Sequence, residues 1–166
     1  LPNGGTSNIV EQLSSSEKIM YAINQRMDTI SDKIEALEPP NDISRSAAKL
    51  HEELGHTYYE ACIAQSQRVA ADPHANNAVH ELDAVFEASL EAYEASIELW
   101  RTYHEHGCVA RIYNLMGNLC LSEYHARPDA SRASVYYAKR LAMYGKDEQL
   151  SPEETSPLTL AVLHPI

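Results

Sequence analysis

Apolar residues recur at steps of three and four along most of the chain, and this spacing predicts amphipathic helices. The pattern is most regular within residues 109–144, where two apolar stripes flank a turn at residues 127–129. Pro128 is tolerated at a helix start, and Asp129 or Ser131 can cap the amides that follow. Such a helix pair must pack on further helices or on another protein. The stripes consist of Ile112, Leu115, Met116, Leu119, Cys120, Ala133, Tyr136, Tyr137, Leu141 and Tyr144.

Residues 7–37 are predicted to form one long helix that Ser7 caps. Their apolar residues occupy two positions of a seven-residue repeat, which only Ser16 interrupts. A sustained repeat of this kind is typical of a coiled coil or of a long helix in a bundle. The stripe either packs on later helices of the same chain or mediates oligomerisation, in which case the protein is chiefly a structural subunit. Its members are Ile9, Leu13, Met20, Ile23, Met27, Ile30, Ile34 and Leu37.

Two further helices are predicted at residues 44–71 and 78–104, where apolar residues again follow helical spacing. The double proline at residues 39–40 separates the first of them from the long helix, because each proline disfavours helical geometry in the residue before it. Residues 72–77 separate the two helices from each other. Gly107 is placed to cap the end of the second one.

The last apolar string lies within residues 151–166 and is predicted to form a final helix, with Pro152 in its first turn, or an extended tail. No segment alternates apolar and polar residues as a half-buried strand does. A chain of 166 residues is long enough for one domain with a core and short for two. The expected fold is all-α, a single antiparallel bundle or array of about six helices over residues 1–166.

Charge and apolar content exclude several classes of partner. The formal net charge of −11 argues against nucleic acids and anionic membranes, since both are polyanions. No apolar run approaches the length of a membrane span, and the first residues lack the basic and hydrophobic regions of a signal peptide. Cys62, Cys108 and Cys120 form no CxxC pair and are odd in number, so reduced thiols in a cytoplasmic setting are expected.

Part of the sequence resembles tetratricopeptide repeats. A Leu-Gly pair followed by Tyr has the spacing of the first helix of the repeat, and it recurs with Met in place of Leu. The helices and loops are longer than in the repeat, and Arg140 occupies a position where a small residue is usual. The resemblance implies a scaffold whose concave helix faces hold an extended, unphosphorylated peptide. The matching residues are Leu54, Gly55, Tyr58, Met116, Gly117, Ala133 and Tyr137.

The order and spacing of short motifs over nearly the whole chain resemble the 14-3-3 family. They are an EKI triplet, a Pro-Asn turn, a tandem tyrosine, an AYEA segment, a Glu before a turn and an LSPEE helix start. On this resemblance, the first two helices of the family and most of its third are missing. The motifs are found at residues 17–19, 40–41, 58–59, 92–95, 123 and 150–154.

This second resemblance implies a cup-shaped, non-catalytic adaptor without a cofactor, which binds phosphoserine or phosphothreonine segments of partner proteins and is commonly a homodimer. Arg and Lys side chains with a Tyr hydroxyl would hold the phosphate. The family has Arg and Tyr directly after its tandem tyrosines, whereas this chain has Glu60 and Ala61. A carboxylate repels phosphate, so the implied phosphate pocket is degenerate, with Arg45, Lys49 or Arg111 as substitute cations.

The resemblance also implies a peptide groove with an apolar wall. Asn114 and Asn118 lie two residues to either side of the position of the peptide-clamping Asn in the family, which Met116 occupies. Leucines of the helix pair and of the last segment match the wall. The groove candidates are Tyr58, Tyr59, Arg111, Asn114, Leu115, Asn118, Leu119, Leu158, Leu160 and Leu163.

Patterns that would indicate catalysis are incomplete. Residues 53–56 have the Glu-x-x-His spacing of di-iron bundles, but the sequence has no second copy. The histidines of the surrounding HEELGH segment are five apart, which is not the HExxH spacing of zinc proteases. His104, His106 and Cys108 could bind a metal with help, although histidines near a helix end are commonly surface residues. A non-enzyme is therefore expected, and a helical metalloenzyme is the less favoured alternative.

Overall fold

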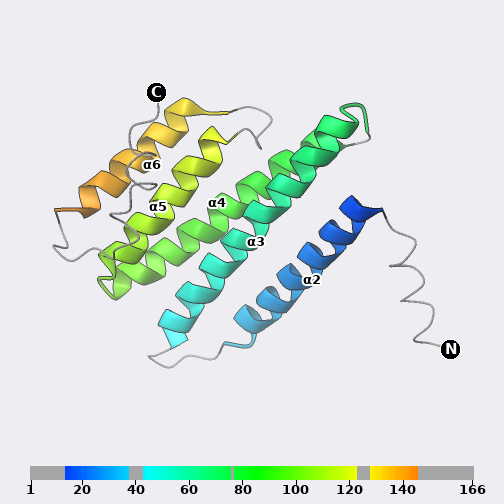
Figure 1. Ribbon diagram of the computed structural model, residues 1–166. Coiled ribbons are helices and arrows are strands. Elements are labelled where there is room, and N and C mark those ends of the chain that lie inside the picture. Colours follow the sequence, from blue (N-terminus) through cyan, green and yellow to red (C-terminus); the bar gives the residue numbers. More distant parts are fainter. Residues whose placement is uncertain (1–13, 38–42, 76, 123–127, 146–166) are drawn as a thin grey trace.

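The computed structural model describes residues 14–37, 43–75, 77–122 and 128–145, most of which are helical (Figure 1). The described part contains no strand, so the predicted all-α class is confirmed. None of its helices is long and apolar enough to cross a membrane. The final helix predicted within residues 151–166 lies outside the described residues, which form five helices where about six were expected. They are α2 (Ser15–Glu35), α3 (Ile43–Ala71), α4 (Ala78–Thr102), α5 (His106–Leu121) and α6 (Ala130–Met143).

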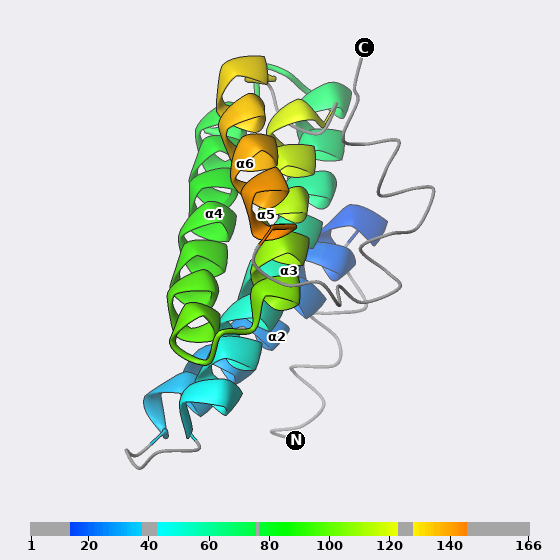
Figure 2. The same cartoon turned by 90° about the vertical axis from the view of Figure 1, so that its left-hand side faces the viewer.

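The helices form an array in which neighbours in the chain are neighbours in space. α2 packs on α3, α3 on α4, α4 on α5 and α5 on α6 (Figure 1). After a turn of the view by 90°, α4 and α6 lie to the left of α3 and α5 (Figure 2). The array therefore consists of two similar helix pairs, α3–α4 and α5–α6, with α2 at the edge beside α3.

The main core lies where the apolar faces of the two helix pairs meet. Leu90 and Tyr93 of α4 are at most 1% exposed, and Ile112 and Met116 of α5 are completely buried. Tyr137 contributes from α6. Burial of each large apolar side chain contributes about 1.5–3 kcal/mol, so these contacts dominate the stability of the array.

Small residues let the two helices within each pair approach closely. Gly55 of α3 lies under the ring of Tyr93, and a Cβ added at this glycine would come within 3.0 Å of the ring carbons. Gly117 of α5 lies under the ring of Tyr137 in the same way. In the first pair the hydroxyl of Ser89 also donates a hydrogen bond of 2.9 Å to the Gly55 carbonyl. The same glycine–tyrosine contact thus recurs in both pairs.

Helix α2 begins later than its apolar repeat predicts. Ser14 has an extended backbone (φ −63°, ψ 166°), and its side-chain oxygen accepts a hydrogen bond from the Glu17 amide. A helix cannot run through a residue of this geometry, so α2 starts at Ser15 rather than near Ser7. The repeat nevertheless has structural meaning within α2, because Ile23 and Ile30 are both only 3% exposed. Ile23 packs against Ala61 and Ala64 of α3.

The helix ends show which capping residues were predicted correctly. Asp129 caps α6, since its carboxylate accepts a hydrogen bond of 2.9 Å from the Arg132 amide. Gly107 was expected to end the third predicted helix, but it lies in the first turn of α5. His104 adopts the left-handed backbone there instead (φ 54°). A left-handed non-glycine residue is uncommon, and His is among the residue types that tolerate it, so the spacing of apolar residues gave no sign of it.

Candidate functional site

Polar side chains follow one face of α3 and one face of α5, and the Glu52–Arg111 ion pair joins these two faces. This set consists of Glu52 and His56 from α3 and of Arg111, Asn114 and Asn118 from α5, and we call it the polar seam. The three α5 residues are three and four positions apart, so they lie on one face of the helix. The two α3 residues are one turn apart, and Glu52 contacts Arg111.

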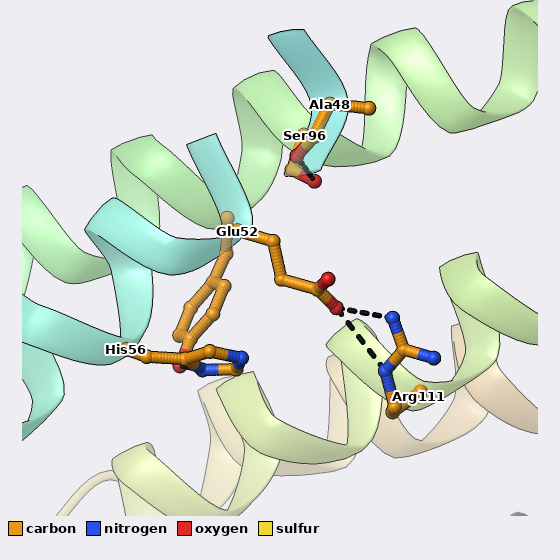
Figure 3. A network of polar contacts seen from close by, with 6 residues as sticks. Ala48, Glu52, His56, Ser96 and Arg111 are labelled. Carbon is orange, nitrogen blue, oxygen red and sulfur yellow. Dashed lines mark hydrogen bonds and ion pairs between the residues drawn. The ribbon is translucent and has the colours of Figure 1, made fainter. Parts of the chain in front are cut away.

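An ion pair between Glu52 and Arg111 joins the two helices (Figure 3). The Nε and Nη2 atoms of Arg111 both donate to Oε1 of Glu52, with the Nε contact at 3.1 Å. The Glu52 side chain is only 12% exposed and that of Arg111 is 32% exposed. Burial lowers the pKa of Arg111, but the hydrogen bond and the charge of Glu52 outweigh this and leave its pKa above the ordinary value. The pair is therefore ionised and resists separation.

His56 is tied to α4 through a hydrogen bond with a buried tyrosine. Its Nδ1 lies 2.7 Å from the hydroxyl of Tyr93, and the two rings meet edge to face. Desolvation lowers the pKa of His56, and the carboxylate of Glu52 opposes this only in part. Burial raises the pKa of Tyr93, so the tyrosine keeps its proton. A neutral imidazole that accepts at Nδ1 from the Tyr93 hydroxyl satisfies both groups.

The two asparagines differ in how their side-chain oxygens are satisfied. Asn118 Oδ1 accepts a hydrogen bond of 2.8 Å from the hydroxyl of Tyr137, whose pKa burial raises to about 12. Asn114 Oδ1 is buried and accepts no hydrogen bond. An unpaired buried acceptor costs about 1–3 kcal/mol, so this oxygen is a position where an added donor would be stabilising.

The other predicted groove residues lie partly on the helix face of the polar seam and partly in the core. Tyr59 is half-buried on the face of α3 that carries Glu52 and His56, and Tyr58 is half-buried about 100° further around that helix. Leu115 is half-buried beside the core, but Leu119 is completely buried and offers no surface to a peptide. Periodicity alone could not distinguish these neighbouring faces of α5. Leu158, Leu160 and Leu163 lie outside the described residues.

The two positions expected to form a degenerate phosphate pocket point away from the seam. Ala61 is completely buried against α2, where Ile23 packs on it. Glu60 is exposed and forms an ion pair with Arg26 of α2. Of the cations suggested as substitutes, Arg45 pairs with Glu105 at 3.0 Å, Arg111 with Glu52, and Lys49 is exposed on α3.

Sequence reasoning missed Glu52, Tyr93 and Tyr137 as members of this network. A signal for Glu52 exists, because it lies four residues before His56 and seven before Tyr59, which places the three on one helical face. Its partner Arg111 is 59 residues away, and no local pattern predicts that pairing. Among the described residues, no group of three His, Cys, Asp or Glu side chains could hold a metal ion, and this includes His104 and His106.

Comparison of the chain with protein-family models, with curated proteins and with solved structures gave no match. The likeness to the 14-3-3 family and to tetratricopeptide repeats therefore rests on the sequence motifs alone. Function has to be inferred from the polar seam itself.

Proposed function

We propose that the protein is a non-catalytic adaptor that binds an extended peptide segment of a partner protein along the polar seam. The observation that carries this proposal is the buried, unpaired Oδ1 of Asn114, which lies on one helical face with Arg111 and Asn118. A peptide N–H group is the donor that it lacks. Because the oxygen is buried, peptide binding requires a local rearrangement of the side chains that cover it.

The spacing of the two asparagines suits an extended backbone. Side chains four residues apart on a helix have Cβ atoms about 5–6 Å apart. Residues two apart in a strand are separated by about 6.6 Å and present their backbone groups to the same side. Tyr137 occupies the oxygen of Asn118 and leaves its NH₂ group to donate. Asn114 would accept from a peptide N–H, and Asn118 would donate to a peptide carbonyl.

The charges around the seam favour peptides without phosphate. Within the seam the guanidinium of Arg111 is held by Glu52, and outside it Arg26 is held by Glu60 and Arg45 by Glu105. A phosphate would have to displace a carboxylate from one of these arginines, at the cost of leaving that carboxylate unpaired. The repeated glycine–tyrosine contact supports a scaffold that binds an extended peptide. It gives the array two equivalent helix pairs, as in a tetratricopeptide scaffold.

The test is a selection of random peptides displayed on phage against the full chain, followed by fluorescence anisotropy of the enriched peptides. Asn114→Ala is expected to weaken binding about three- to tenfold, the value of one net hydrogen bond. Asn24→Ala changes an exposed Asn of α2 and serves as the matched control, with unchanged affinity. Phosphorylated versions of the same peptides, and a phosphoserine peptide of the 14-3-3 ligand type, should bind no better. Failure to enrich any peptide, or equal binding by Asn114→Ala, would refute the proposal.

A further inference from the structure

A cavity of about 400 Å³ lies between α4, α5 and α6. None of its lining residues belongs to α3 or to the polar seam. Its volume is within the range of sites that bind small molecules. It is therefore a second candidate site, independent of the proposed peptide adaptor function.

The floor of this cavity is apolar and aromatic. The rings of Tyr113 and Tyr136 are stacked, with centroids 6.4 Å apart and planes 22° apart. They are only 4% and 6% exposed, and Ile97 lies beside them with 2% exposure. This floor is rigid, and the small part of it that stays exposed can contact the apolar part of a ligand.

The walls carry charges of both signs. Glu98 of α4 lies 3.4 Å from Arg101, which also donates to the hydroxyl of Tyr113 at 2.5 Å. Glu94 accepts only a long contact of 3.5 Å from the Tyr136 hydroxyl. On the opposite wall, Lys139 of α6 lies 5.7 Å and 5.9 Å from the centroids of the two tyrosine rings. Lys139 has no carboxylate partner within the described part of the chain. Glu94 and Lys139 are thus a negatively and a positively charged side chain that line one cavity without pairing with each other.

We propose that this cavity binds a small zwitterion of the size of a free amino acid. The ligand ammonium would pair with Glu94, its carboxylate with Lys139, and its apolar part would lie on the tyrosine floor. The two carboxylates and two cations of the lining cancel in formal charge. A simple anion would meet the carboxylates of Glu94 and Glu98, and a simple cation would meet Lys139 and Arg101. A zwitterion satisfies both walls at once.

The experiment is isothermal titration calorimetry of the full chain with L-leucine and L-phenylalanine. Binding with a Kd of about 1 mM or tighter is expected for at least one of them. The same amino acid with an acetylated amine, or with an amidated carboxylate, should bind at least about tenfold more weakly, because one ion pair is lost. No binding by either free amino acid, or equal binding by the capped analogues, would overturn the proposal.

Variants locate the ligand within the cavity. Glu94→Gln should weaken binding of the free amino acid about tenfold and leave the N-acetyl analogue unaffected, since that analogue has no ammonium. Lys139→Gln should also weaken binding of the free amino acid about tenfold. It should leave the amidated analogue unaffected, since that analogue has no carboxylate. Glu91→Gln and Lys18→Gln alter exposed residues outside the cavity and are the controls. All four positions are exposed, so the variants are expected to fold, which circular dichroism would check. If neither Glu94→Gln nor Lys139→Gln changed the affinity, the ligand would bind elsewhere and the proposed zwitterion site would be refuted.

Discussion

The ring of Tyr93 lies directly on the backbone of Gly55, so closely that a Cβ at this glycine would stand 2.5 Å from a ring carbon. Tyr93 is completely buried, so its ring has no space into which it could move. The same relationship between Tyr137 and Gly117 sets the approach of the second helix pair. These two contacts fix the distance between the helices that carry the polar seam and the helices behind them.

Gly55→Ala is expected to lower the free energy of unfolding by about 1–2 kcal/mol. Overpacking against a buried ring costs about 1–3 kcal/mol, and the better helix propensity of Ala returns at most about 1 kcal/mol. Urea denaturation followed by circular dichroism measures the change. Gly145→Ala is the matched control, because nothing lies within 4 Å of a Cβ at that position. If Gly55→Ala were as stable as the natural chain, the close contact would not exist in solution.

The sequence predicted the helices better than it predicted their faces. Helical spacing located the five described helices, and Asp129 was one of the two capping residues proposed, with Ser131, for the start of α6. The end of α4 was missed because His104, rather than Gly107, takes the left-handed backbone. Leu119 was assigned to the groove although it is buried, since neighbouring stripes of one helix look alike in a sequence.

The site was predictable only in part, because sequence patterns show which residues share a helix but not which residues meet between helices. Arg111, Asn114 and Asn118 were named as groove candidates, and α5 carries all three on one face. The residues that they meet on other helices, Glu52 and Tyr137, follow from tertiary packing and have no local signal. Glu60 was assigned to a degenerate phosphate pocket, and in the structure it pairs with Arg26 of α2.

Breaking the ion pair of the seam should destabilise the fold more than breaking an exposed pair. Glu52→Ala is expected to cost about 1.5–3 kcal/mol, since it leaves the half-buried guanidinium of Arg111 without its acceptor. Glu105→Ala removes the partner of Arg45 in an exposed pair and should cost less than about 1 kcal/mol. Chemical denaturation of the two variants gives the comparison. Equal losses would mean that the Glu52–Arg111 pair is as solvated as the exposed one.

Stability should fall on acidification because of His56. Its pKa in the folded chain is lowered from 6.5, so the unfolded chain binds more protons as the pH falls below that value. Stability is therefore fully present above the unfolded pKa and is lost as the pH falls toward the folded pKa. His51 is shifted in the same direction and adds to the effect. Melting temperatures of the natural chain and of His56→Gln, measured from about pH 8 to about pH 5, should show a shallower decline in the variant. A parallel decline would assign the pH dependence to other groups.

The apolar repeat of α2 should contribute to stability through Ile23 rather than through Ile19. Ile23 is 3% exposed in the contact with α3, whereas Ile19 is 49% exposed. Ile23→Ala is expected to cost about 2–4 kcal/mol, and Ile19→Ala less than about 1 kcal/mol. Urea denaturation would measure both. If Ile19→Ala were as costly as Ile23→Ala and its effect grew with protein concentration, the exposed side of α2 would be an interface between copies of the chain. Sedimentation of the Ile19→Ala variant would then show a smaller assembly than the natural chain.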